Sequence, residues 1–171
     1  PSLNSLIQLN KKYQFSSNES LAKISSAKEI ISLLNRPSRI CGMVVNEGLP
    51  GGGPFWVKNN RKISKQIVEK AQISEDPEQL KILQKSSHFN PVLIVASPLD
   101  LNGNKIDLQK HIDHQSYFIV NKNQEGKAIK YIELPGLWNG AMSDWNTIFM
   151  ETPTESFSPV KSINDLLEPP H

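Results

Sequence analysis

Two apolar runs, each long enough for a buried β-strand, constrain the fold of this chain most strongly. They are "RICGMVV" at residues 39–45 and "NPVLIVASP" at residues 90–98. Apolar runs of this length, bounded by turn residues, are typical of strands that are covered on both faces. Segments with helical spacing lie around and between them. The sequence therefore predicts an α/β domain with a mixed β-sheet and flanking helices.

The other elements are predicted from residue spacing and turn residues. Residues 1–17 are polar with little periodicity, so we expect an extended lead-in before a single domain at 18–171. Apolar residues from Leu21 to Leu34 recur at mostly helical spacing before Pro37, which predicts one helix. "SEDPEQLKILQKS" predicts a short helix capped by Ser74. The remaining predictions are strands at 54–57, 65–73 and "WNTIFMETP", a hairpin at 116–134 around "NKNQEG", and a short helix in "SINDLL".

Three consecutive glycines, Gly51, Gly52 and Gly53, stand between two prolines in "GLPGGGPFW". Glycine permits a positive φ and close approach of the backbone, and consecutive amides can face an anionic group. The segment lacks the GxxxxGK[ST] pattern, and a predicted strand follows it, so it is neither a P-loop nor a dinucleotide-binding turn. Two interpretations stay open, a close-packed structural turn and a loop that faces a ligand.

Charge and cysteine content limit the class of protein. The net charge is +2 and the basic residues are scattered, so we expect no nucleic-acid partner. No apolar run approaches the roughly 20 residues of a membrane helix, so we expect no membrane partner. Cys41 is the only cysteine, which excludes an internal disulfide and fits a reducing cytoplasm. Its place in an apolar run favours an inert buried thiol over a nucleophile.

Two other polar motifs have both a structural and a functional interpretation. "HIDH" places His111 and His114 three residues apart, but no third metal ligand accompanies them, so exposed surface residues are favoured. Lys161 follows a proline turn and could pair with a phosphate as a point charge, although a solvated lysine is the simpler expectation. No Ser/His/Asp, Cys/His or GxSxG arrangement is found, so the residues alone identify no catalytic site.

The segment "GLWNGAMSDWN" at 136–146 is richer in polar and aromatic residues than a core segment requires. Trp138 and Trp145 could stack on a sugar or a base. Asn139, Asp144 and Asn146 could form hydrogen bonds with hydroxyl groups. The alternative is a packed loop whose Asn and Asp side chains cap nearby backbone, and composition does not decide between the two.

The strings "NRPSRICGMVVNEGLPGGGPFWV", "LNGNKIDL", "ELPGLWNGAMSDWNTIF" and "FSPVKSINDLL" span most of the chain after about Arg36. They resemble the C-terminal part of an uncharacterised bacterial family, domain of unknown function 4301. Members of that family are longer, and their N-terminal part carries a glycine-rich loop. The resemblance implies that this chain is a C-terminal fragment. If the missing part covers the sheet, the chain should expose an apolar patch.

Three shorter strings occur in the order "QIVEKAQIS", "HFNP" and "ESFSPVKS". They are similar to "QVVEYSEIS", "LFNAGN" and "DEFSPLKN" of the UDP-N-acetylhexosamine pyrophosphorylases. The resemblance implies that Glu69 and Asn90 hold a sugar, that Lys161 offsets phosphate charge, and that Trp138 and Asn139 complete the wall. It also implies a Mg²⁺ ion in the full-length parent and the fold of the sugar-side portion of a nucleotide-diphospho-sugar transferase.

These observations lead to one main hypothesis. The chain would be the sugar-side portion of a cytoplasmic nucleotidyltransferase-like protein that joins a nucleoside triphosphate to a sugar 1-phosphate and releases pyrophosphate. Lys161 would be catalytic, and its ligand would be a sugar phosphate or nucleotide sugar. The fragment would be inactive without its nucleotide-binding N-terminal part. The alternatives are a non-catalytic sugar- or nucleotide-binding module and a structural domain.

Overall fold

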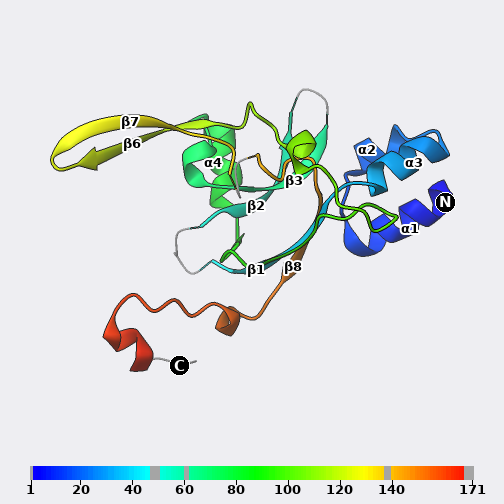
Figure 1. The fold of residues 1–171 in the computed structure, drawn as a ribbon. Helices are drawn as coiled ribbons and strands as arrows, with labels where there is room; N and C mark the ends of the chain where they lie inside the picture. The colour runs from blue at the N-terminus through cyan, green and yellow to red at the C-terminus, as the bar shows by residue number, and fades with distance from the viewer. Residues whose placement is uncertain (1, 47–50, 60–61, 137–139, 168–171) are drawn as a thin grey trace.

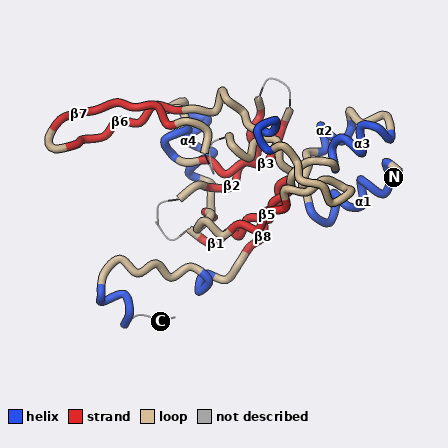
Figure 2. Tube along the Cα trace, viewed as in Figure 1, coloured by secondary structure: helices blue, strands red, loops and turns tan. Residues whose placement is uncertain are grey.

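The computed structural model describes residues 2–46, 51–59, 62–136 and 140–167 (Figure 1). Short helices are combined with several small β-sheets, and the three N-terminal helices group at one end of the molecule (Figure 2). The predicted α/β class is therefore confirmed. The helices are α1 (Leu3–Tyr13), α2 (Asn18–Ala22), α3 (Ala27–Leu34) and α4 (Pro77–Gln84), with 3-10 turns η1 (Lys70–Gln72), η2 (Leu108–His111), η3 (Thr154–Ser156) and η4 (Ile163–Leu167). The strands are β1 (Ser38–Val45), β2 (Gly53–Lys58), β3 (Ile63–Val68), β4 (His88–Phe89), β5 (Ile94–Ser97), β6 (Phe118–Gln124), β7 (Lys127–Glu133) and β8 (Asn146–Glu151).

β1 is the central strand of the largest sheet. It pairs in parallel with β8 and antiparallel with β5, so that Cys41 lies opposite both Phe149 and Ile94. The last two residues of β1 pair with the short strand β4. The apolar run at 39–45 is thus confirmed as a strand with a buried centre. The second run is a strand only over β5, because residues 90–93 form the connection between β4 and β5.

The β2–β3 hairpin covers one face of this sheet. Cys41, Met43 and Ile67 are at most 3% exposed, and Ile94 and Phe149 pack against them. Burial of this kind is the main favourable term in folding. It also raises the pKa of the Cys41 thiol, although the Arg39 charge opposes the shift. The predicted burial of Cys41 is confirmed.

The opposite face of the sheet carries exposed apolar side chains. Ile40 lies opposite Val95, and Met150 lies opposite Gly42. The Leu93 side chain occupies the space beside Gly42 where another residue would have its Cβ. These four large side chains are between 39% and 69% exposed. The apolar patch that the sequence led us to expect is therefore present on this face, with no described segment covering it.

The N-terminal helices form a second, smaller core. Leu6 on α1 packs with Leu21 and Ile30, and each is at most 6% exposed. The expected extended lead-in at 1–17 is therefore wrong, because Ser2 caps a helix whose apolar residue Leu6 has partners further along the chain. The single helix expected after it is also wrong. Ser26 starts α3 with a capping box, which separates it from α2.

Two local boundaries differ from the prediction near β3 and α4. The predicted strand at 65–73 ends at Val68, and the Gln72 side chain accepts a hydrogen bond from the Glu69 amide across the turn η1. The cap of α4 is Asp76 rather than Ser74, because its side chain accepts from the amides of the first helical turn. None of the helices in the described ranges is both long and apolar enough to cross a membrane.

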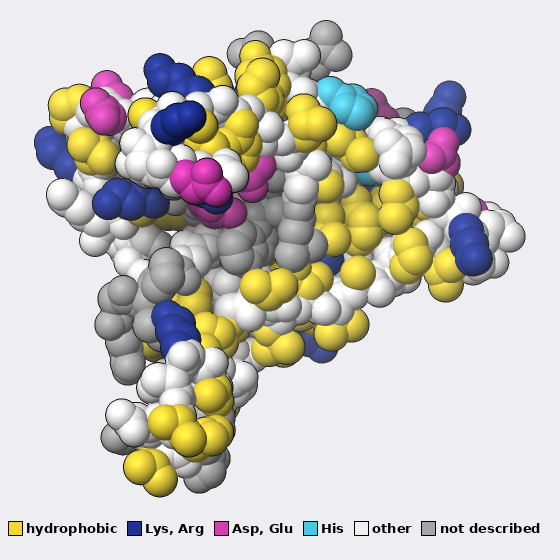
Figure 3. Space-filling view, turned by 60° about the vertical axis from the view of Figure 1, so that its left-hand side comes forward, with side chains coloured by type: hydrophobic (Ala, Val, Ile, Leu, Met, Phe, Trp, Pro, Cys, Tyr) yellow, Lys and Arg dark blue, Asp and Glu magenta, His cyan; other side chains and the backbone are white. Residues whose placement is uncertain are grey.

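Two segments project from the body. The β6–β7 hairpin confirms the predicted one, but its turn is tighter than "NKNQEG", since only Glu125 and Gly126 lie between the strands, both at positive φ. The C-terminal segment after β8 forms the lowest part of the molecule in Figures 1 and 3. It carries Ile163 and Leu167, which are 81% and 84% exposed, so hydrophobic side chains show on this projection in Figure 3.

Candidate functional site

Some of the residues predicted to bind substrate lie around one cavity of about 1350 Å³, here called the Glu69 cavity. Gly51 and Gly53 form one wall before and at the start of β2, and Glu69 forms another where β3 turns into η1. Helix α4 supplies Leu80 and Leu83. The structure therefore brings together two motifs that are about 16 residues apart and that were selected for different reasons.

The glycine segment is closely packed as well as cavity-lining. A Cβ at Gly51 would lie 2.5 Å from the buried ring of Phe89, so this position requires glycine. Gly52 accepts a hydrogen bond from the Asn90 amide at 2.8 Å, which ties the segment to the connection between β4 and β5. Residues 51–53 thus support both interpretations, the close-packed turn and the loop that faces a ligand. Residues 48–50 of "GLPGGGPFW" lie outside the described part of the chain.

Glu69 is the acidic residue that the resemblance assigns to the sugar, and it is half-buried. Burial raises the pKa of its carboxyl group, and the nearby charge of Glu133 raises it further. The Glu69 amide donates to Gln72 at 2.9 Å, which fixes the backbone from which the carboxylate projects. A carboxylate held in this way at a cavity wall can accept hydrogen bonds from ligand hydroxyl groups.

Asn90 has a backbone-holding role. It is 1% exposed, and its Nδ2 donates to the carbonyl groups of Gly42 at 2.7 Å and Leu93 at 3.2 Å. Its Oδ1 accepts from the amide of Val92, which has a positive φ of 66°. The side chain thus fixes the β4–β5 connection and, through its own amide, the glycine wall of the cavity.

The other predicted site residues lie apart from the Glu69 cavity or are not described. Lys161 is exposed, and its backbone amide donates to Asp165 at 2.7 Å. It follows Phe157, whose ring packs edge-to-face on Phe89 at 5.3 Å, beside the position of Gly51. Trp138 and Asn139 lie outside the described residues.

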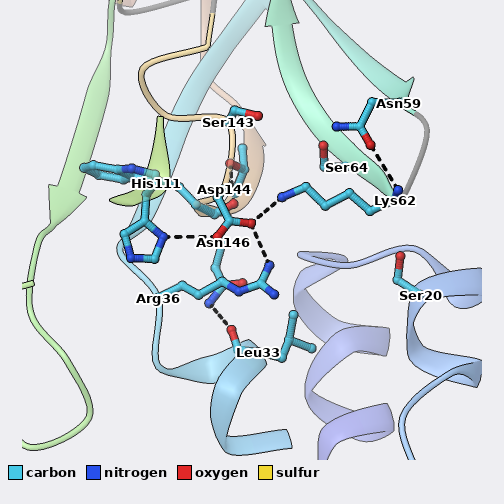
Figure 4. Close-up of polar contacts among 12 residues, drawn as sticks. Ser20, Leu33, Arg36, Asn59, Lys62, Ser64, His111, Ser143, Asp144 and Asn146 are labelled. Carbon is cyan, nitrogen blue, oxygen red and sulfur yellow. Dashed lines mark hydrogen bonds and ion pairs between the residues drawn. The ribbon is translucent and has the colours of Figure 1, made fainter. Parts of the chain in front are cut away.

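A second polar site was only partly visible in the sequence. Asp144, before β8, accepts from Arg36 Nη1 at 3.1 Å, from Lys62 Nζ, and pairs with His111 Nδ1 at 3.1 Å. Figure 4 shows the three side chains pointing toward this carboxylate from separate segments, and we call the four residues the Asp144 cluster. The expectation of an exposed His111 is wrong, since its side chain is only 15% exposed.

The electrostatics of the Asp144 cluster keep the carboxylate charged. Burial alone would raise the pKa of Asp144, but the Lys62 hydrogen bond and the charges of Arg36 and Lys62 outweigh it and lower that pKa below its usual value. Asn146 has a structural role beside the cluster, since its Nδ2 donates to the Leu33 carbonyl at 2.9 Å. For Asp144 and Asn146, the contacts therefore support the interpretation of 136–146 as a packed loop. Trp145 is 7% exposed and belongs to the interior.

No group of three or more His, Cys, Asp or Glu side chains that could hold a metal ion is found among the described residues. The Asp144 cluster contains one histidine and one carboxylate, and its other two members are cations. Such a set repels a metal ion. The cluster is therefore better suited to holding four segments together than to metal chemistry.

Comparison with known proteins places the chain in a family. The family model described as "Domain of unknown function (DUF4301)" matches residues 3–171, so the chain belongs to that family, as the resemblance of its longer strings implied. The match also takes in the N-terminal helices, beyond the region where we had noted the resemblance. No curated protein matches the chain.

Proposed function

We propose that this member of the family of unknown function forms the sugar-binding side of a nucleotidyltransferase-like protein. The reaction would join a nucleoside triphosphate to a sugar 1-phosphate. An oxygen of the sugar phosphate would attack the α-phosphorus, and the bond to the leaving pyrophosphate would break. Such reactions depend mainly on positioning and on stabilising charge at phosphorus. The part proposed for this chain is to bind and orient the sugar phosphate.

The observation that carries this proposal is that Glu69 and the glycine segment line the same cavity. A sugar needs hydrogen-bond acceptors for its hydroxyl groups and a close-fitting wall. The Glu69 carboxylate is an acceptor, and Gly51 and Gly53 give a wall without side chains. In this proposal Asn90 acts through the backbone, because its side chain holds the connection that fixes Gly52.

Lys161 does not line the Glu69 cavity, so it enters the proposal through the segment that carries it. The segment that carries it is anchored at Phe157, which packs on Phe89 next to the glycine wall. Movement of the exposed residues after this anchor would bring an ammonium group toward a phosphate at the cavity mouth. The resemblance implies that the divalent cation and the nucleotide would be bound by the nucleotide-binding part of the parent protein.

A non-catalytic sugar-binding module is the second candidate. It is favoured by the position of Lys161, which is exposed and does not line the Glu69 cavity. Both candidates predict the same ligand at the same carboxylate, so binding does not separate them. Turnover of a nucleoside triphosphate and a sugar 1-phosphate by the full-length protein would favour the transferase, and binding without turnover would favour the module.

The binding test uses saturation-transfer NMR on the folded chain with sugar 1-phosphates, UDP-sugars and free nucleotides in the presence of Mg²⁺. We expect a sugar 1-phosphate or a nucleotide sugar to bind, and Glu69→Gln to weaken binding by about tenfold, which is typical for one lost charged hydrogen bond. Glu78→Gln is the matched control, because Glu78 lies in the exposed first turn of α4 and does not line the cavity. Equal binding by both variants, or no binding by the folded chain, would count against the Glu69 cavity.

A further inference from the structure

Two cationic side chains are buried between the main sheet and the β2–β3 hairpin without an acidic partner. Arg39 on β1 is 2% exposed, and Lys65 on β3 is 7% exposed. Among the described residues, neither forms an ion pair with Asp or Glu. Buried charges in proteins are normally paired, because an unpaired charge loses its hydration without compensation. This interior therefore has an excess of positive charge that needs an explanation.

One edge of the Arg39 guanidinium group has a hydrogen-bond partner for only one of its two nitrogens. Its Nε donates to Thr147 Oγ1 at 2.9 Å, and its Nη2 donates to Gln66 Oε1 at 3.3 Å. Its Nη1 is fully buried and has no hydrogen-bond partner. The Nη1–Nη2 edge of arginine matches two oxygens of a carboxylate or phosphate, but a neutral amide supplies only one oxygen.

Lys65 adds a second charge to the same interior. Its Nζ lies 5.4 Å from the ring centroid of Trp56 and 5.3 Å from that of Phe149. Phe149 follows Thr147 on the same face of β8, and Thr147 is the partner of Arg39. Aromatic rings stabilise a cation only partly, and burial lowers the pKa of Lys65.

Gln66 links Arg39 to a second cavity of about 680 Å³, here called the Gln66 cavity. Its Nε2 donates to Ser64 Oγ at 3.0 Å and to the Ser143 carbonyl at 2.9 Å, and all three residues line this cavity. The Gln66 amide thus stands in a polar wall with Arg39 directly behind it. Rotation of this side chain would expose the unsatisfied edge of the guanidinium group.

The rest of the cavity wall is compatible with a small anionic molecule. Trp56 and Tyr117 give it aromatic surface, and Lys58 contributes another positive charge. The one acidic residue among the described residues that line it is Asp113, whose two oxygens accept from the Gln115 amide and the Ser116 hydroxyl. That carboxylate is held by its own loop, and no contact links it to Arg39.

We propose that the Gln66 cavity binds the phosphate group of a small molecule, with Arg39 as the residue that holds it. In the bound state, phosphate oxygens replace Gln66 Oε1 and accept from both Nη1 and Nη2 of Arg39. Ser64 then offers its hydroxyl, and Trp56 faces the remainder of the molecule. This site is formed by other side chains than Glu69, so it stands or falls independently of the proposed sugar site.

The test is isothermal titration calorimetry of the whole chain with inorganic phosphate, with acetate at equal ionic strength as the comparison anion. We expect the wild-type chain to bind phosphate more tightly than acetate. Arg39→Met should weaken phosphate binding by at least about tenfold, because it removes a charged hydrogen-bond donor. Gln66→Glu should do the same for a different reason, since it places a carboxylate against Arg39 and occupies the site from within.

Gln124→Glu is the matched control for Gln66→Glu, because it makes the same change of charge at the exposed end of β6. It should leave phosphate binding unchanged, whereas Gln66→Glu should also raise the melting temperature by pairing the buried cation. If Arg39→Met does not fold, Gln66→Glu decides the question alone. Absence of phosphate binding by the wild-type chain would overturn the proposal. Equal binding by the wild-type chain and Gln66→Glu would overturn it as well.

Discussion

Two pairs of cationic residues occupy equivalent places at the start of β1 and of β3, in two different sheets, and have opposite surroundings. Arg36 and Lys62 stand just before β1 and β3, and Arg39 and Lys65 follow each of them by three residues. The outer pair shares the carboxylate of Asp144 and is 28–29% exposed. The inner pair is almost fully buried and has no acidic partner among the described residues. The same residue types therefore contribute to the fold in the outer pair and oppose it in the inner pair.

This difference separates stability from function. The outer pair joins the end of α3, the start of β3 and the loop before β8, so it has a sufficient structural explanation. The inner pair has none, because a hydrophobic residue of similar size would fill the same space without a desolvation penalty. Unexplained buried charge is often found at functional sites, and this is why we assign a ligand to Arg39 rather than to the Asp144 cluster.

The largest expected effect is from Asp144→Asn. This change leaves Arg36 and Lys62 facing a neutral amide, so we expect the free energy of unfolding to fall by about 2 kcal/mol. Urea denaturation followed by circular dichroism measures it. Asp107→Asn is the matched control. Asp107 pairs with the exposed Lys110, and its Oδ1 accepts from the Gln109 amide, a capping bond that asparagine can keep, so the change should alter stability by less than about 0.5 kcal/mol. Equal effects of the two changes would remove the distinction drawn for the outer pair.

Arg39→Met should act in the opposite direction. Methionine fills much of the same volume without a charge, so we expect the free energy of unfolding to rise by about 1 kcal/mol in the absence of ligand. Arg36→Met, three residues earlier, should lower it, because it takes a partner from Asp144. The same urea titrations compare the two variants. A loss of stability in both would mean that Arg39 is as well compensated as Arg36.

The sequence predicted the parts of the fold that depend on local pattern. The apolar run of β1, the β6–β7 hairpin and β8 have their signal within a few consecutive residues, and all three were predicted. Helix α1 was missed, because its polar residues mask its one buried apolar side chain, Leu6, whose partners Leu21 and Ile30 lie in later helices. Tertiary contact decided that element, and local propensity did not.

The candidate sites were less predictable for the same reason. Arg36 and Asp144 are 108 residues apart, so no motif spacing could reveal their pairing. Arg39 is the first residue of the apolar run at 39–45, and a charge at that position is typical of an exposed strand end rather than of a buried interior. Its burial follows from the positions of Thr147 and Gln66, on two other strands. Glu69, by contrast, was selected through a resemblance and not through periodicity or spacing, and its role stays a prediction.

A smaller effect is expected in acid. The pKa of Asp144 is lowered in the folded state, so its stabilising contribution is complete above the unfolded value of about 3.9 and is lost as pH falls through the folded pKa. The wild-type chain should therefore lose more stability than Asp144→Asn when the pH is lowered from about 5 to about 3. Urea titrations at several pH values measure this difference. Parallel curves for the two proteins would show that the carboxylate is not stabilised by its cations.

The smallest effect should appear in alkali and comes from the inner pair. Burial lowers the pKa of Lys65, so between that lowered value and about 10.4 the folded chain binds fewer protons than the unfolded chain. Stability should accordingly rise with pH in this window, as the unfavourable buried charge is removed. Lys65→Met should lack this component, while Lys62→Met should retain it, because Lys62 is outside the buried interior. Urea titrations at about pH 8 and about pH 10 compare the three proteins. If the free energy of unfolding of Lys65→Met rose as much as that of the wild-type chain, the charge of Lys65 would not destabilise the fold. Arg39 would then be the one unfavourable buried cation of the inner pair.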